Sequence, residues 1–310
     1  MKTVFSIVAV SYIFSGTLRA SESEAIYLSV DKKTLTADLK TLPEDFSQSK
    51  SLRQFKIAIG KKEGDKEKSG DYKTPEGIYF VQSPIQEGTI PKIKYGPGAI
   101  PLNFPNPFDH YQGKSGHGIW LHGAGQNRRI EEANITEGCV AFHNEEVFHL
   151  MNWLQPFQGL VLIAADASLT NRAEEVAEVR KSTLGWINAW TDRNLTDYIS
   201  FYSDDFSYEG KNKRNYENYK DSVFHLYKNI NLKIGHLRVL VHSKYALTIM
   251  DQDFRGDERY VSDGRKILYW TRNEKLKKWE IIRENFESRR FQFLKLDSFV
   301  LGAMTPGAAH

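Results

Sequence analysis

The chain contains one cysteine, Cys139, and a histidine, His122, lies seventeen residues before it. A free thiol has a pKa of about 8.5, so most of it is protonated at neutral pH and reacts poorly. A histidine within hydrogen-bonding reach can accept that proton and activate the sulfur. These two residue types at this spacing predict a nucleophile, Cys139, with His122 as its base. The alternative is a buried cysteine that acts only as a small apolar side chain.

The residues just before Cys139 favour a tight turn. Gly138 has wide backbone freedom and lets a substrate carbonyl approach closely. We expect the amides of Gly138 and Cys139 to form an oxyanion hole. Thr136 either hydrogen-bonds near the thiol or shapes the turn. Glu137 is expected to face solvent, because a carboxylate pointing at the sulfur would disfavour the thiolate.

The apolar stretch that ends at His122 holds two further candidates for substrate contact. Side chains along a regular strand alternate between its two faces. Trp120 would then share the face of His122, where core packing is favoured over substrate contact. His117 would point to the opposite face and lie at the rim of the site. His143 and His149 could join His122 around a metal, but no second cysteine or closely spaced carboxylate supports zinc, so neither a metal nor another cofactor is predicted.

Composition indicates an ordinary globular protein with room for two domains. Of its 310 residues, 40% are apolar and 26% charged, and the 13% of aromatic residues argue against disorder over most of the chain. The formal net charge is only +3, and no dense basic stripe with interleaved aromatics is present, so nucleic acid is not predicted as a partner.

The N-terminus predicts export. Lys2 precedes an apolar run over residues 4–14, and small residues follow up to Ala20. This order is typical of a secretory signal peptide, which we place at residues 1–20, with an uncleaved anchor as the alternative. The protein is therefore expected in the periplasm or otherwise outside the cytoplasm. Its single cysteine cannot form an internal disulfide.

Strands predominate in the segment that must position these residues. Alternating apolar and polar residues over 26–39, around an Asp-Lys-Lys turn, predict a hairpin. Further strands are expected over 55–60, 77–81, 118–122 and 160–165, with a helix over 145–155 capped by Asn144. Five prolines over 91–107 predict a loop without regular helix. The first domain is therefore mainly β and covers residues 26–165.

The rest of the chain predicts a second domain of the α+β class. A linker is placed at 166–179, with a charged helical stretch over 172–179, and helices are expected over 184–190 and 215–228. Strands of high β-propensity follow over 237–241, 245–251, 267–271 and 279–286. Helices followed by antiparallel strands are typical of α+β domains. The boundaries expected are 180–295 for this domain and 296–310 for a tail.

Two motifs in the first domain carry a family resemblance. One is His122-Gly123 followed by Thr136-Glu137-Gly138-Cys139-Val140, and the other is the stretch from Gly70 to Tyr79, which reads GDYKTPEGIY. Together they resemble the L,D-transpeptidase catalytic (YkuD-type) domain. The resemblance implies a β-sandwich-like fold and thioester chemistry on peptidoglycan stem peptides. Cys139 would expel the terminal D-alanine, His122 would act as base, and the Gly123 carbonyl would orient the imidazole.

Departures from the family pattern bear on the reaction. Family transpeptidases usually read Ser-His-Gly-Cys-X-Arg/Asn, whereas this chain has Glu137 before the glycine and Ala141 two residues after Cys139. These differences favour hydrolysis over cross-linking. Arg129 could bind the carboxylates of a stem peptide through its two-pronged guanidinium, with a solvated loop as the alternative.

The second domain resembles the cone-shaped nuclear-transport-factor-like fold. The two domains in this order resemble cell-shape-determining L,D-carboxypeptidases, which trim tetrapeptides to tripeptides. The cone would bind wall polymer or help the protein dimerise; a homodimer and protein partners in the cell envelope both stay open. The alternatives are an L,D-transpeptidase that cross-links peptidoglycan or attaches a protein or amine to it, and a non-catalytic cell-wall-binding protein.

Overall fold

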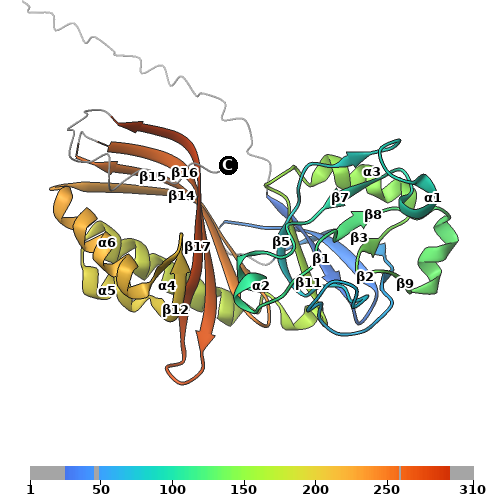
Figure 1. Cartoon of the computed structure of the whole chain (residues 1–310), viewed down its shortest axis with the longest axis horizontal. Coiled ribbons are helices and arrows are strands. Elements are labelled where there is room, and N and C mark those ends of the chain that lie inside the picture. The colour runs from blue at the N-terminus through green and yellow to red at the C-terminus, as the bar shows by residue number, and fades with distance from the viewer. Residues whose placement is uncertain (1–24, 45–48, 258–259, 294–310) are drawn as a thin grey trace, which may run out of the picture.

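The computed structural model describes residues 25–44, 49–257 and 260–293, which form two domains side by side (Figure 1). The predicted signal peptide at 1–20 and the predicted tail at 296–310 lie outside the described residues. Within those ranges no helix is both long and apolar enough to cross a membrane.

Two sheets build the first domain. The larger has the strand order β3-β2-β1-β11-β5, the smaller has the order β10-β8-β7-β6, and β4 pairs with β9. In chain order the elements are β1 (Ile26–Asp31), β2 (Thr36–Thr41), β3 (Ser51–Lys56), β4 (Ile59–Gly60), β5 (Gly77–Phe80), β6 (Ile85–Gln86), α1 (Lys92–Tyr95), β7 (Gly98–Pro101), α2 (Pro107–Tyr111), β8 (Trp120–His122), η1 (Asn127–Glu132), β9 (Asn134–Thr136), β10 (Val140–Ala141), α3 (Asn144–Trp153), β11 (Leu160–Ala164) and η2 (Ala167–Leu169).

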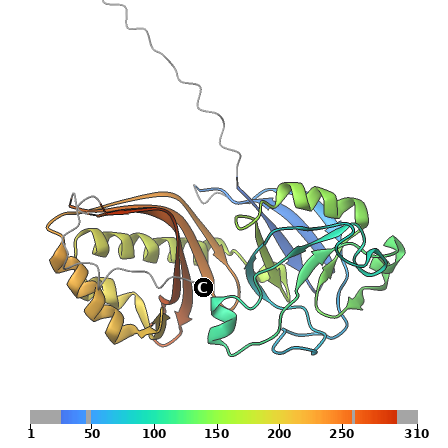
Figure 2. The same ribbon diagram turned by 45° about the horizontal axis from the view of Figure 1, so that its top comes forward.

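The second domain wraps one long sheet around its helices, as Figure 2 shows. Its six strands have the order β13-β12-β17-β16-β15-β14. The elements are α4 (Ala173–Thr191), α5 (Leu195–Ser200), β12 (Tyr202–Tyr208), β13 (Lys211–Asn212), α6 (Lys213–Leu226), β14 (Ile230–Val241), β15 (Ala246–Gly256), β16 (Tyr260–Asn273) and β17 (Lys278–Phe293). The mainly β first domain and the α+β second domain agree with the fold class expected from the sequence.

A shared apolar core joins the two domains. Leu160 and Leu162 of β11 point toward the second domain, whereas Val161 and Ile163 point into the core of the first. The second domain contributes Leu247, among others, to the shared core. A strand buried on both faces must be apolar throughout, which explains the continuous apolar run of β11.

Three expectations about local structure differ from what is observed. The stretch 91–107, expected to be a loop without regular helix, contains the helix α1 and the strand β7. Its prolines are tolerated because Pro91 caps α1, Pro101 ends β7 and Pro107 begins α2, where a backbone N–H is not needed. Asn144 is not the N-cap of α3. That position belongs to His143, and Asn144 Oδ1 accepts a hydrogen bond from the Ala124 amide at 3.0 Å.

The predicted linker is the third difference, because its expected helical stretch is part of the second domain. From Ala173 onward the segment 166–179 forms the first turns of α4, continuous with the aromatic helix expected after it. Val179 is fully buried in the core of the second domain. The charged residues that suggested a linker lie on the exposed side of an amphipathic helix.

Candidate active site

Two adjacent parallel strands bring the predicted nucleophile and base together. Strand β10 pairs with β8, with Val140 opposite Leu121 and Ala141 opposite His122. Val140 and Leu121 both point into the core of the first domain. Since neighbours along a strand alternate in direction, the His122 side chain lies on the other face, and Cys139 directly precedes β10 on that same face. Both side chains line one pocket of about 570 Å³.

Cys139 is held as a buried thiol. Only 9% of the residue is exposed. Its Sγ lies 3.4 Å from the Gly118 carbonyl oxygen, to which the thiol donates. Burial raises the pKa of Cys139 to about 11, although a hydrogen bond from the Trp120 backbone amide to the sulfur acts in the opposite direction. The sulfur is therefore protonated at neutral pH and must lose its proton during the reaction.

The ring of His122 is held in one orientation and one tautomer. Its Nδ1 lies 2.5 Å from the Gly123 carbonyl oxygen, which can only accept, so Nδ1 carries the hydrogen and Nε2 keeps a free lone pair. The edge of the imidazole meets the Tyr95 ring at a centroid distance of 5.1 Å. Burial lowers the pKa of His122 to about 4, so the ring is neutral at physiological pH. A Cβ at Gly123 would lie 2.3 Å from Asn144 Oδ1, which explains glycine at this position.

Thr136 shapes the turn that presents the thiol. Its Oγ1 donates to the Cys139 carbonyl at 2.7 Å and accepts from the Gly138 amide at 3.1 Å. The Gly138 amide is thus engaged inside the turn, and its part in an oxyanion hole stays a prediction. Gly138 has a φ of +131°, and a Cβ there would lie 2.7 Å from the Lys73 carbonyl oxygen. Glu137 is exposed, as expected, and forms an ion pair with Lys94 at 3.4 Å.

Of the other predicted site residues, two line the pocket and one does not. His117 and Arg129 are exposed and line the pocket of Cys139. The expectation that His117 faces away assumed a regular strand, but β8 begins only at Trp120, and Gly118 before it has a φ of +74°. Trp120 is not among the residues that line this pocket; its ring packs on Tyr95 at a centroid distance of 5.0 Å.

Lysines and tyrosines at the pocket wall were missed from the sequence. Lys61, Lys66, Tyr72, Lys94 and Tyr95 line the pocket, together with His117 and Arg129. Two of the lysines belong to the charged loop after β4, and only the tertiary fold brings that loop over the thiol. The GDYKTPEGIY motif was the available signal, since it contains Tyr72 and borders this loop.

Neither of the two remaining histidines discussed as metal ligands lies in the pocket. His143 Nε2 faces Glu131 Oε1 at 3.8 Å, and His149 stacks on Trp153. In the part of the chain that the structure describes, no group of three or more His, Cys, Asp or Glu side chains is arranged to hold a metal ion.

The second domain has its own cavity, of about 250 Å³, between the helices and the sheet. Lys220 Nζ lies there, 4.3 Å from the centre of the Trp190 ring, and burial lowers the pKa of Lys220 to about 7. Lys266 and Glu284 form a buried ion pair at 2.8 Å beside it. The Gln252 Oε1 atom, which also faces this cavity, has no hydrogen-bond partner among the described residues. This cavity is a candidate binding site separate from that of Cys139.

Fold and site together define a two-domain protein in which a strand-rich unit carries a cysteine–histidine pair. The model of the L,D-transpeptidase catalytic domain family matches residues 30–163, and that of the Cds6 C-terminal NTF2-like domain matches residues 178–285. The first domain is thus similar to the L,D-transpeptidase catalytic domain family, and the second domain is similar to the Cds6 C-terminal NTF2-like domain. Both assignments agree with the resemblances seen in the sequence.

Similar proteins support the same architecture. YafK of Escherichia coli strain K12, named as a candidate L,D-transpeptidase, is 28% identical over 130 residues, or 42% of this chain and 47% of its own length. The chain thus matches about half the length of this curated relative. Bd1075 of Bdellovibrio bacteriovorus superposes with a TM-score of 0.74 at 24% identity, covering 88% of this chain and 96% of the other. The helical cell shape determining protein Pgp2 from Campylobacter jejuni gives 0.68 at 22% identity, covering 85% and 92%. These two structures share the fold across both domains.

Proposed function

We propose that this protein is an exported peptidoglycan L,D-carboxypeptidase that trims stem tetrapeptides to tripeptides through an acyl-enzyme on Cys139. The observation that carries the proposal is that one pocket is lined both by Cys139 and by a neutral His122 whose ring is fixed by the Gly123 carbonyl. The match of the first domain to the L,D-transpeptidase catalytic domain family supports the substrate class.

The first half of the reaction forms a thioester. As the sulfur attacks the carbonyl carbon before the terminal D-alanine, its proton passes to Nε2 of His122. Both groups start neutral, because burial raises the pKa of the thiol and lowers that of the imidazole. Proton transfer and attack are therefore coupled. The C–N bond then breaks, and the D-alanine amine leaves with the proton from His122.

The second half restores the enzyme. Water loses a proton to Nε2 of His122 and attacks the thioester carbon, the C–S bond breaks, and the sulfur regains the proton. We favour water over a second peptide as the acceptor because Glu137 and Ala141 replace the residues usual in family transpeptidases. Ala141 is fully buried against Ala58, so it offers no polar group to an acceptor.

The charge of the pocket wall suits a stem peptide. Lys61, Lys94 and Arg129 line it as exposed cations, against Glu137 as the exposed anion. Lys66 also lines it but is buried and paired with Asp71. Stem peptides carry several carboxylates, which ammonium and guanidinium groups bind through charge-assisted hydrogen bonds. The second domain would bind wall polymer through its own cavity.

The test is incubation of the purified protein with disaccharide tetrapeptide, followed by mass analysis of the products. Tripeptide with free D-alanine is expected from the wild-type protein, and none from Cys139→Ala. His122→Ala should lose at least a hundredfold in rate, the usual scale for a general base. Cross-linked dimers would indicate a transpeptidase instead, and an unchanged substrate would indicate a wall-binding protein. Activity that survives in Cys139→Ala would overturn the mechanism.

A further inference from the structure

A turn of the second domain is anchored within the first. Residues His242–Tyr245 join β14 to β15 and contact the first domain at several points. His242 Nε2 donates to the Ile163 carbonyl oxygen at 3.1 Å, and its Nδ1 accepts from the Lys244 amide at 3.2 Å. The Tyr245 hydroxyl accepts from the Ile78 amide at 2.5 Å and from Asn106 Nδ2 at 2.9 Å. This turn is fixed in the first domain by hydrogen bonds on both sides of Lys244.

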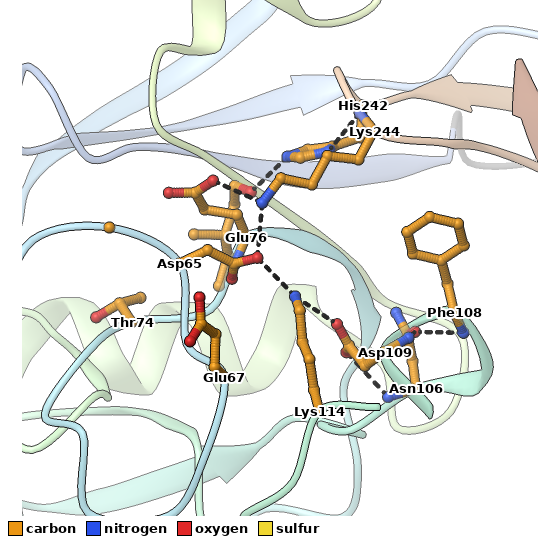
Figure 3. A network of polar contacts seen from close by, with 12 residues as sticks. Asp65, Glu67, Thr74, Glu76, Asn106, Phe108, Asp109, Lys114, His242 and Lys244 are labelled. Carbon is orange, nitrogen blue, oxygen red and sulfur yellow. Dashed lines mark hydrogen bonds and ion pairs between the residues drawn. The ribbon is translucent and has the colours of Figure 1, made fainter. Parts of the chain in front are cut away.

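Lys244 links two acidic residues of the first domain, as Figure 3 shows. Its Nζ lies 2.6 Å from Asp65 Oδ2 and 3.0 Å from Glu76 Oε2. Lys114 holds the same Asp65 oxygen at 2.7 Å, and Lys32 holds the other oxygen of Glu76 at 2.9 Å. The side chains of Asp65 and Glu76 are only 16% and 10% exposed, so water screens these pairs weakly.

The charges of this network balance only when Lys244 is present. Asp109 completes it, 2.9 Å from Lys114, so that three carboxylates face three ammonium groups. Lys244 is the member that the second domain supplies. Without it, three largely buried carboxylates would face only two ammonium groups.

Asp65 and Glu76 lie at the two ends of a loop, residues 65–76, that forms part of the wall of the Cys139 pocket. Asp65 Oδ1 accepts from the Glu76 amide at 2.8 Å, which joins the ends of the segment 65–76. Lys66 and Tyr72 of this loop line the pocket. The loop also supports the nucleophile turn, since the Lys73 carbonyl oxygen packs against Gly138.

We propose that Lys244 is a positioning residue for the substrate pocket, through which the second domain holds the 65–76 loop over Cys139. This inference rests on the proposed function where it concerns turnover. Through Lys244 the second domain would take part in the reaction of the first domain, whether or not a ligand occupies the cavity of the second domain. Lys244 does not line the pocket, so its effect must pass through Asp65 and Glu76.

The experiment compares Lys244→Met, which keeps the length of the side chain without its charge, with Lys244→Arg, which keeps the charge. The control is Lys33→Met, which removes the ion pair of an exposed lysine with Asp166 in the first domain. We expect Lys244→Met to raise KM for disaccharide tetrapeptide about tenfold with a smaller change in kcat. Lys244→Arg should recover most of this loss, and Lys33→Met should match the wild-type protein.

A second readout needs no turnover. The rate at which iodoacetamide alkylates Cys139 reports how well the loop covers the thiol, and Lys244→Met should raise it at least threefold while the protein stays folded. A Lys244→Met variant with a lower melting temperature but unchanged KM and alkylation rate would overturn the proposal, because Lys244 would then act on stability alone. If the wild-type protein released no tripeptide, the proposed function would fail while the alkylation comparison still tested Lys244.

Discussion

Replacing Thr136 with valine should disrupt the turn that presents Cys139. The two side chains have nearly the same shape, so the change removes the hydroxyl with little loss of packing. That hydroxyl donates a hydrogen bond to the Cys139 carbonyl at 2.7 Å and accepts one from the Gly138 amide at 3.1 Å. Thr136 is only 8% exposed. A buried polar group left without a partner costs about 1–3 kcal/mol. With two such groups, and partial relaxation of the turn, we expect a loss of about 2–4 kcal/mol in the free energy of unfolding.

Urea unfolding followed by tryptophan fluorescence measures this loss, and Thr136→Ser, which keeps the hydroxyl, is the matched control. The serine variant should lose roughly 1 kcal/mol or less. Turnover, measured where all variants are folded, should fall at least tenfold in the valine variant only. If Thr136→Val unfolded at the wild-type urea concentration, the hydroxyl would not hold the turn. Faster turnover in this variant would also refute the reasoning, since it would show that the Gly138 amide works better once released.

Three further predictions concern pH and the backbone. Burial lowers the pKa of both His122 and His242 to about 4, so below pH 6.5 the unfolded chain binds protons that the folded chain does not. The free energy of unfolding should therefore be highest above about pH 6.5 and should fall by roughly 3 kcal/mol for each histidine between pH 6.5 and pH 4. In urea titrations, His242→Gln should remove about half of that loss. Because burial raises the pKa of Cys139 to about 11, its alkylation rate should keep rising about tenfold per pH unit from pH 7 to 10, and a plateau near pH 8.5 would contradict this. Gly138→Ala places a side chain at a φ of +131° and against the Lys73 carbonyl oxygen. The variant should lose about 2 kcal/mol in the free energy of unfolding and most of its turnover. An active variant of wild-type stability would show that the turn can adapt.

Cys139 and His122 could be proposed as nucleophile and base from the sequence because their signal is local. Cys139 is the only cysteine, and the glycine before it marks a turn, so residue type alone suggested a nucleophile. Two short motifs then supplied the family. The adjacency of β8 and β10, which brings His122 to the thiol, follows from pairing between strands and was visible in the sequence only through that family resemblance.

Errors arose where a pattern depended on distant partners. His117 was assigned a face from strand alternation, but the chain before Trp120 is not a strand. The charged helical stretch before Val179 suggests a linker, because the burial of its apolar side depends on the core of the second domain. Prolines suggested a loop at 91–107, yet they occupy the ends of α1 and β7, where they do not interrupt hydrogen bonding.

The sequence by itself determined the chemistry available to this protein: one thiol, its candidate base, the glycines around them and the succession of a β domain and an α+β domain. Only the tertiary structure decided the protonation states of these groups and the residues that surround them. It buries the thiol and the imidazole so that both are neutral, and it places the lysines of a distant loop at the pocket wall. It also brings Lys244 to Asp65 and Glu76, more than 160 residues away along the chain. Burial and ion pairing depend on groups that meet only on folding, and for that reason neighbouring residues in the sequence cannot predict them.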